Sequence, residues 1–192
     1  MREAIKLGFF LLITCALVGL GVSYTNALTA PIIAESEKLV QEQGLMEVYS
    51  DAEEIKDETE KYLSSEDSVL KQVNVAYKAG KPVGVIYTVE SKGYGGSIKT
   101  LVGFDIVSCT ITNIKILSHT ETPGLGAQAT EPWFAERFQG KSATADLEVV
   151  KQTPQDGNEV QAITAATVTS KAVTLGINEA RNHFQVNFIE AF

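Results

Sequence analysis

The 192-residue chain has few of the residues from which metal centres and redox clusters are built. It holds two cysteines and two histidines, with neither a CxxC pair nor a Cys/His cluster. Because a structural zinc or an iron–sulfur cluster takes about four such ligands, we expect no metal site in this chain. Cys15 lies in an apolar run and Cys109 in a predicted strand, so we expect no disulfide between them.

Positive charge is also scarce, since 16 Lys and Arg stand against 24 Asp and Glu and give a net charge of −8. Nucleic-acid binding requires a basic face, so the composition predicts no nucleic-acid partner. Residues 35–67 hold twelve acidic residues and three lysines, a local charge of −9. Apolar residues recur at helical spacing from Pro31 to Tyr49. We therefore predict an acidic, solvated helical stalk over residues 29–68.

One long hydrophobic run is present near the N-terminus. Residues 7–28 carry no charge and, as a helix, would extend about 33 Å, close to the hydrocarbon thickness of a bilayer. Arg2 and Lys6 precede the run, and the next charge, Glu35, is acidic. The positive-inside rule then predicts a cytoplasmic segment at residues 1–6, a transmembrane helix at 7–28 and an external remainder.

A cleaved secretory signal is the alternative interpretation of this run. Its purely hydrophobic centre is short, and the residues from Ala27 to Ala30 loosely resemble a cleavage site. Cleavage after Ala30 would place Pro31 beside the scissile bond, which signal peptidases disfavour. An uncleaved single-pass anchor is therefore the prediction.

Beyond residue 69 the pattern changes to alternating, β-rich runs. Two runs flank the turn residues Ala79 to Pro82, and two more are expected to turn near Thr112 and Asn113. A short aromatic helix, a strand near residues 147–151 and a last helix from about Val168 follow. Strands first and helices later predict an α+β fold, with a largely antiparallel sheet and flanking helices.

Two loop stretches carry residues suited to ligand binding or catalysis. In "SKGYGGSIKT" the glycines would admit close approach of the backbone to a ligand, and Tyr94 has a ring that stacks on flat groups. In "SHTETPGLGAQA" the polar residues His119 and Glu121 precede a Pro-Gly turn at the end of a strand. The alternatives are a loose connection in the first case and a simple surface pair in the second.

A third stretch, "QAITAATVTS", opens the last helix with hydroxyl groups and small residues. A helix N-terminus offers unpaired N–H groups and the positive end of its dipole, so phosphate binds there readily. The ordinary alternative is that Thr167 or Thr164 caps the helix. The stretch alone leaves both interpretations open.

The stretches "GYGGSI", "SHTETPGLGAQATEPWFAERFQGK" and "ITAATVTSKAV", in this order behind one anchor, resemble the covalent-FMN domain family. That family includes the G subunit of the Rnf complex (ion-translocating ferredoxin:NAD+ oxidoreductase) and the C subunit of the Na+-translocating NADH:quinone oxidoreductase. The resemblance covers essentially the whole chain, "ETPGLG" is its most specific part, and the short length is more similar to the Rnf subunit.

The resemblance implies a covalent attachment site. Family members carry FMN through a phosphodiester between its 5′-phosphate and the last hydroxyl of a Ser/Thr-Gly-Ala-Thr motif. The matching residues here are Thr164 to Thr167, which makes Thr167 the acceptor and Thr169 the fallback. Two residues depart from the pattern, Ala165 in place of glycine and Gln161 in place of aspartate. An alanine is harmless at this position if its φ is negative.

The same resemblance implies a pocket around the flavin. Tyr94 is expected near the ring system, with Gly96 and Ser97 near the ribityl chain or phosphate. The remaining cofactor-binding residues expected from the three stretches are Glu121, Thr122, Leu125, Gly126, Thr164, Ala165, Ala166, Val168 and Thr169.

The function implied is electron transfer by covalent FMN in a domain, residues 69–192, outside the bacterial cell membrane. The chain would be one redox subunit of an ion-transporting ferredoxin:NAD+ oxidoreductase, with no catalytic residues of its own. Its partners would be the other Rnf subunits, membrane lipid and the flavin transferase that attaches FMN. The alternatives are a cofactor-free tethered binding or scaffold domain, and a hydrolase using His119 and Glu121. No Ser or Cys nucleophile in a sharp turn accompanies that pair, which disfavours the hydrolase.

Overall fold

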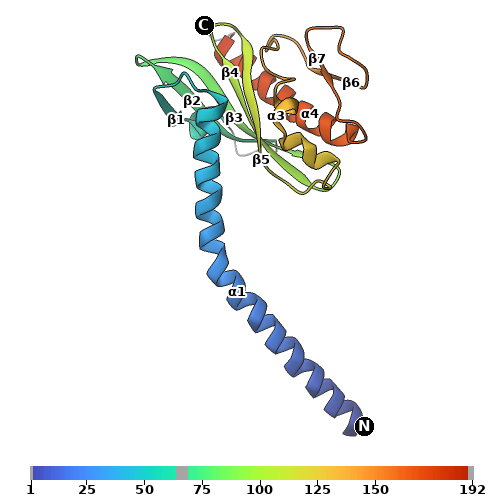
Figure 1. Cartoon of the computed structure of the whole chain (residues 1–192). Coiled ribbons are helices and arrows are strands. Elements are labelled where there is room, and N and C mark those ends of the chain that lie inside the picture. Colours follow the sequence, from blue (N-terminus) through green and yellow to red (C-terminus); the bar gives the residue numbers. More distant parts are fainter. Residues whose placement is uncertain (1, 64–68, 190–192) are drawn as a thin grey trace. The chain divides into compact units, whose positions relative to one another are not determined.

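One long helix opens the computed structural model, which describes residues 2–63 and 69–189. Helix α1 spans Arg2–Val48 and includes Pro31 (Figure 1). Within Ile5–Val48 the mean hydropathy reaches 2.2 over 18 residues. A helix that is apolar all round is typical of a membrane span. By length and composition α1 is therefore able to cross a bilayer.

The chain divides into two compact units, residues 1–41 and residues 42–192. The second unit, called the domain below, includes the last turns of α1 and a five-stranded antiparallel sheet in the order β1-β2-β3-β4-β5. Its strands, with one short helix between the first two, are β1 (Glu54–Asp57), α2 (Thr59–Tyr62), β2 (Leu70–Lys78), β3 (Lys81–Lys92), β4 (Ser97–Asp105) and β5 (Thr110–His119).

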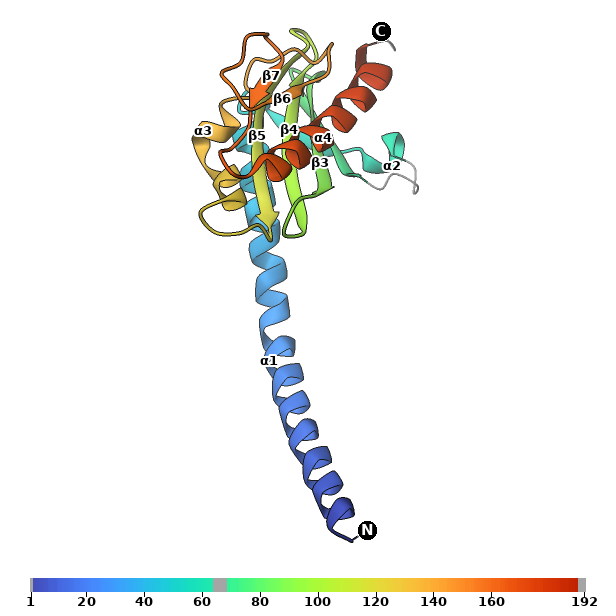
Figure 2. The same ribbon diagram turned by 90° about the vertical axis from the view of Figure 1, so that its right-hand side faces the viewer.

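The second layer of the domain is a set of short elements and one long helix. These are η1 (Gly126–Thr130), α3 (Pro132–Ala135), β6 (Glu148–Val150), β7 (Glu159–Gln161), α4 (Thr167–Phe184) and the π-helical segment η2 (Gln185–Ile189). Strands β6 and β7 pair in parallel as a separate two-stranded sheet. Figure 2 shows α4 crossing one face of the large sheet.

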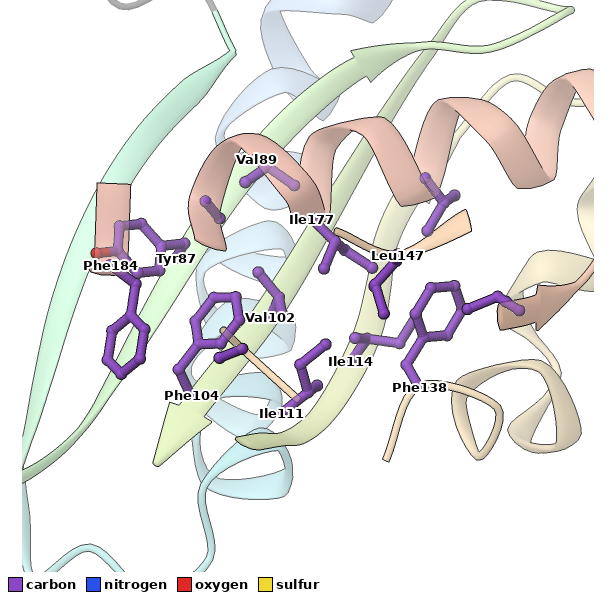
Figure 3. Close-up of a cluster of buried hydrophobic side chains, with 14 of the residues drawn as sticks. Tyr87, Val89, Val102, Phe104, Ile111, Ile114, Phe138, Leu147, Ile177 and Phe184 are labelled. Carbon is purple, nitrogen blue, oxygen red and sulfur yellow. The ribbon is translucent and has the colours of Figure 1, made fainter. Parts of the chain in front are cut away.

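The main core lies between α4 and this face of the sheet. Apolar residues recur along α4 at helical spacing, so that Val173, Ile177 and Phe184 are fully buried on one side. The rings of Phe104 and Phe184 stack with their centroids 4.9 Å apart, and Tyr87 meets Phe104 edge to face (Figure 3). The helix is thereby fixed against the strands that carry the neighbouring loops.

The other face of the sheet packs against the end of α1. Val48 and Tyr49 are buried there with Ala76, Ile86 and Leu101. The Tyr49 hydroxyl lies 2.9 Å from the Val83 carbonyl and 2.8 Å from Asp105 Oδ2. The last turn of α1 is thus part of the domain and is joined to β3 and β4.

The predicted fold class is confirmed, but the stalk prediction is wrong after Val48. Residues Glu54–Asp57 form the edge strand β1, paired with β2 from Glu54 opposite Tyr77 to Asp57 opposite Asn74. Ile55 packs against the cluster around Tyr49, and this tertiary contact overrides the helical interpretation of an acidic stretch. Residues 64–68 of the predicted stalk lie outside the described residues.

The turn predicted at Thr112 and Asn113 is also misplaced. Both residues lie in β5, and the chain turns at residues 106–109. Asp105 Oδ1 accepts hydrogen bonds from the Ser108 N–H at 2.7 Å and hydroxyl at 2.9 Å, and Cys109 has a φ of 52°. Cys109 is therefore a turn residue rather than a strand residue. Strand β7 had no counterpart among the strands expected from the sequence pattern.

Candidate functional site

Three loop stretches that are distant in sequence meet at a cavity of about 430 Å³ beside the first turn of α4. This space, called the α4 cavity below, falls within the roughly 300–1,000 Å³ typical of small-molecule sites. It is lined by Tyr94, Glu121, Thr122, Leu125, Gly126, Ala165, Ala166, Thr167, Val168 and Thr169. All ten were expected from the sequence to surround a cofactor.

The start of α4 has no side-chain cap. Ala166 occupies the N-cap position, and Thr167 is the first helical residue. The interpretation of Thr167 or Thr164 as a capping residue is therefore wrong. Within the described part of the chain, no hydrogen bond engages the Thr167 hydroxyl, which is half-buried at the cavity wall. The first N–H groups of any helix have no partner one turn earlier, so they are free to bind an anion.

The turn before α4 is strained. Ala165 has a φ of 62°, in the left-handed region where a residue with a Cβ costs about 1–2 kcal/mol. The condition for a harmless alanine, a negative φ, is therefore not met. The Ala166 N–H closes the turn on the Ile163 carbonyl at 3.0 Å. Because glycine adopts this φ freely, the turn geometry explains a glycine at this place in a motif.

Glu121 connects the three stretches of the cavity. The residue is only 6% exposed. Its Oε1 accepts a hydrogen bond from the Gly95 N–H at 2.9 Å, and its Oε2 accepts one from the Thr169 hydroxyl at 2.6 Å. A Cβ on Gly126 would collide with Glu121 Oε2 and Thr169 Oγ1. The glycine that follows Leu125 therefore makes room for the hydrogen bond between Glu121 and Thr169.

The glycines around Tyr94 allow close packing between loops. A Cβ on Gly93 would collide with Glu121 Oε1, and one on Gly95 with the Thr120 carbonyl. This packing is a reason for the glycines that the sequence did not reveal, and Tyr94 itself reaches the cavity. Tyr94 is 78% exposed and forms an open rim.

Three predicted residues do not line the cavity. Gly96 packs against the Thr120 side chain, where a Cβ would collide with Oγ1. Ser97 is the first residue of β4, and its hydroxyl donates a hydrogen bond to the Glu90 carboxylate in β3. Thr164 is exposed in the strained turn beside the cavity.

His119 and Glu121 do not form a side-chain pair. His119 Nδ1 lies 3.1 Å from the Glu121 backbone N–H, and the Glu121 carboxylate points to Gly95 and Thr169. No hydroxyl among the described cavity residues is hydrogen-bonded to a histidine. The geometry gives the hydrolase alternative no activated nucleophile.

Two residues that support the site were not predicted. Ser170 is fully buried, accepts the Ile163 N–H at 2.9 Å and donates to the Ala166 carbonyl at 3.1 Å, so it holds the strained turn on the helix. Arg137 donates to the Gln161 carbonyl at 2.5 Å and lies 4.5 Å from the centre of the Trp133 ring. Burial lowers the pKa of this guanidinium from its ordinary value. The signal that could have revealed Arg137 is its place in the aromatic stretch "WFAERF".

The charge of the α4 cavity is low and negative. Among the described residues that line it, Glu121 alone has a charged side chain, and neither Lys nor Arg is present. An anionic group bound there would rely on backbone N–H groups and the helix dipole rather than on a cationic side chain. Leu125 and Val168 contribute exposed apolar surface at its mouth.

Residues 93–182, which include the whole cavity lining, match the family described as FMN-binding domain. Relatives that match over most of their length identify a narrower family. The G subunit of the Na+-translocating ferredoxin:NAD+ oxidoreductase complex of Acetobacterium woodii is 36% identical over 96% of this chain and 93% of its own. The proton-translocating counterpart from Clostridium ljungdahlii is 36% identical over 88% and 85%. The chain therefore belongs to the family of G subunits of ion-translocating ferredoxin:NAD+ oxidoreductase complexes.

Solved structures give the same fold. NqrC of Shewanella oneidensis superposes with a TM-score of 0.53 at 24% identity, over 62% of this chain and 59% of that chain. The C subunit of the Na+-translocating NADH-quinone reductase from Parabacteroides distasonis gives a TM-score of 0.52 at 28% identity, over 61% of each chain. In both comparisons the similar region covers less than two thirds of this chain and less than two thirds of the solved chain.

Proposed function

We propose that the α4 cavity holds FMN, joined through its 5′-phosphate to the Thr167 hydroxyl, and that the chain is an electron-transfer subunit of an ion-translocating ferredoxin:NAD+ oxidoreductase. The observation that carries this proposal is the Thr167 hydroxyl itself. It lies on the cavity wall at the first residue of α4 and, among the described residues, takes part in no hydrogen bond. A capping hydroxyl would be occupied, whereas an attachment point must be accessible.

The residues around Thr167 fit a phosphate diester. The helix N-terminus supplies N–H donors and the positive end of the dipole, which offset one negative charge. Ala165 and Ala166 add no side chain beyond a methyl group, so space remains beside the hydroxyl. The new bond would join Thr167 Oγ, which loses its proton, to the 5′-phosphorus of an activated FMN donor. The bond between that phosphorus and the donor's leaving group would break, and the proposed flavin transferase would supply the donor.

The remaining walls fit a flat, largely apolar ring. Tyr94, Leu125 and Val168 offer apolar surface around the opening, and Glu121 with Thr169 closes the inner side. When bound, the isoalloxazine supplies the redox chemistry. The chain would hold the ring and fix its orientation through the inner wall, where Glu121 is hydrogen-bonded to Gly95 and Thr169. The same packed wall would keep water away from the ring.

Helix α1 would be an uncleaved single-pass anchor in the bacterial cell membrane, in contact with lipid. Arg2 and Lys6 before the apolar run favour a cytoplasmic N-terminus, so the domain would lie outside. A covalent bond suits that location, because an exported domain has no pool of free FMN to replace losses by mass action. The reaction partners of the flavin would be cofactors in neighbouring subunits.

Flavin fluorescence after denaturing electrophoresis tests the attachment. The full chain, expressed with the transferase in the exported compartment, should give a fluorescent band near its own size. Thr167→Ala should abolish that band and leave the fold intact, since the side chain makes no hydrogen bond within the described structure, and Thr167→Ser should retain it.

Thr153→Ala is the matched control, because Thr153 is exposed between β6 and β7, lies outside the attachment motif and lines no part of the cavity. A band that survives Thr167→Ala but disappears in Thr169→Ala would move the attachment site to Thr169. A chain that stays colourless in the presence of the transferase would favour the cofactor-free scaffold.

A further inference from the structure

A second hollow lies in the domain, away from the α4 cavity. A groove of about 470 Å³ runs between the last turns of α1 and strands β1 and β2. This α1 groove is lined by Glu42, Leu45, Met46, Tyr49, Ser50, Ala52, Glu53, Glu54, Ile55, Asp57 and Asn74. It shares none of these residues with the α4 cavity.

The groove combines an apolar floor with an acidic rim. Leu45 and Ile55 are partly buried against the core cluster around Tyr49, while the Met46 side chain is 71% exposed. Among the described residues that line the groove, four are carboxylates and none is Lys or Arg. Some of the negative charge is offset locally, since Glu54 pairs with Lys56 at 3.1 Å on the surface. The rim nevertheless presents one sign of charge around low-dielectric walls, which attracts cations.

Asn74 gives an independent indication of a missing partner. It is 3% exposed and lines the groove, yet its side-chain Nδ2 has no hydrogen-bond partner among the described residues. Its Oδ1 accepts from Gln72 Nε2 at 3.4 Å, so the amide is oriented with its donors unused. A buried donor without an acceptor costs roughly 1–3 kcal/mol. An incoming carbonyl oxygen would remove that cost.

We infer that the α1 groove binds a cationic, amphipathic polypeptide segment of another subunit of the same membrane complex, an inference that rests on the proposed function. Apolar side chains of the segment cover Leu45, Met46 and Ile55, its Lys or Arg side chains face the carboxylate rim, and a carbonyl oxygen accepts from Asn74 Nδ2. A second copy of this chain is a poor occupant because its net charge is −8. Anionic lipid headgroups are repelled by the same rim.

A photo-crosslinking amino acid in place of Met46 tests this inference in the assembled membrane complex. Met46 is exposed, so the replacement is tolerated by the fold. The expected product is an adduct with a different polypeptide, and its crosslinked peptide should contain Lys or Arg among apolar residues. The matched control is Val107, which is 86% exposed in the turn between β4 and β5 and lines no described hollow. The control should give no such adduct.

Charge reversal at the rim sharpens the result. Glu54→Lys should lower the crosslink yield at Met46 by about ten-fold or more, because like charges then face each other across the interface. An adduct with lipid, with a second copy of this chain or with an acidic segment overturns the inference, as does equal labelling from Met46 and Val107. Flavin fluorescence of the same band reports the proposed function separately, so either idea can fail alone.

Discussion

The two hollows of the domain differ in how far the chain satisfies its own polar groups. In the α4 cavity the carboxylate of Glu121 has hydrogen bonds to both oxygens. In the α1 groove the rim carboxylates have partners too, such as the Ala79 N–H for Glu53 and the Thr59 hydroxyl for Asp57, but the buried Nδ2 of Asn74 lacks one within the described structure. In the first hollow the buried polar side chains are paired with each other, and the Thr167 hydroxyl on the wall takes part in no hydrogen bond within the described structure, which fits the proposed covalent attachment. The second leaves complementary bonds for a protein partner to make.

The sharpest probe of this contrast is Thr169→Val in the α4 cavity. The substitution removes the hydroxyl that donates to the buried Glu121 carboxylate at 2.6 Å. Leaving a buried charged group short of one donor should reduce stability by about 1.5–3 kcal/mol, measured by thermal unfolding of the full chain in detergent.

The matched variant is Thr174→Val on the same helix. The Thr174 hydroxyl is buried without a partner in the described structure, so its loss should be neutral or stabilising. Equal losses in the two variants would show that Glu121 and Thr169 are not coupled, and the contrast between the hollows would break down.

Gly126→Ala should also damage the cavity. The added methyl group would collide with the Glu121 carboxylate and the Thr169 hydroxyl, and overpacking of this kind costs about 1–3 kcal/mol. The flavin band should weaken along with the melting temperature. Gly157→Ala serves as the control, since a Cβ there meets no described atom within 4 Å. If both variants behave alike, the close packing around Glu121 is not required.

On the groove side, Tyr49→Phe should have a smaller, pH-dependent effect. Burial alone would raise the pKa of the Asp105 carboxyl, but hydrogen bonds from Ser108 and Tyr49 outweigh it and hold that pKa below its usual 3.8. A carboxyl with a lowered folded-state pKa stabilises the fold above the unfolded pKa and loses this contribution as pH falls through the folded value.

Tyr49→Phe should therefore cost about 1 kcal/mol at pH 6, and this cost should shrink below pH 3.8 as pH falls through the lower folded-state pKa of Asp105. Thermal unfolding at several pH values gives the measurement. In an Asp105→Asn background the pH dependence of the Tyr49→Phe effect should disappear. A difference that is constant with pH would show that the hydroxyl acts only through the Val83 carbonyl.

The smallest expected effect comes from Ala165→Gly. Relief of a left-handed φ by about 1–2 kcal/mol is partly offset by the roughly 0.5–1 kcal/mol of chain flexibility that glycine adds, which leaves a gain of about 0.5 kcal/mol. Ala79→Gly, at a φ of 51° in the hairpin between β2 and β3, should give a similar gain in thermal unfolding. Only the change at Ala165 should alter the extent of flavin attachment.

Local pattern was sufficient for strands β2 and β3 and their hairpin, whereas the family resemblance of the three stretches named the residues that line the α4 cavity. The hairpin at Ala79 and the helix near Val168 carry short-range signals, and a resemblance in motifs pointed to Thr167. The conformation of Ala165 was not predictable, because its positive φ is imposed by the turn that Ser170 holds closed. Glu121 was expected beside the ring, but its bonds to Gly95 and Thr169 depend on contacts between distant segments.

The α1 groove could not have been anticipated, for a related reason. Its wall includes β1, which the acidic pattern predicted as helix, and its lining includes Asn74, which is an ordinary strand residue in sequence. This groove forms only because α1 ends at Val48 and the following segment, β1, pairs with β2. Periodicity within one segment carries no information about that pairing.

The construction of the α4 cavity also sets the stage of folding at which the proposed FMN could be bound. Tyr94, Glu121 and Thr167 come from three separate stretches, so the cavity requires long-range contacts that form late, after loop closure has been achieved. A nascent or misfolded chain presents the Thr167 motif but no pocket beside it. If FMN is attached as proposed, stable loading would mark molecules that had completed folding, and the fluorescent fraction of a preparation would set a lower bound on the share of native molecules.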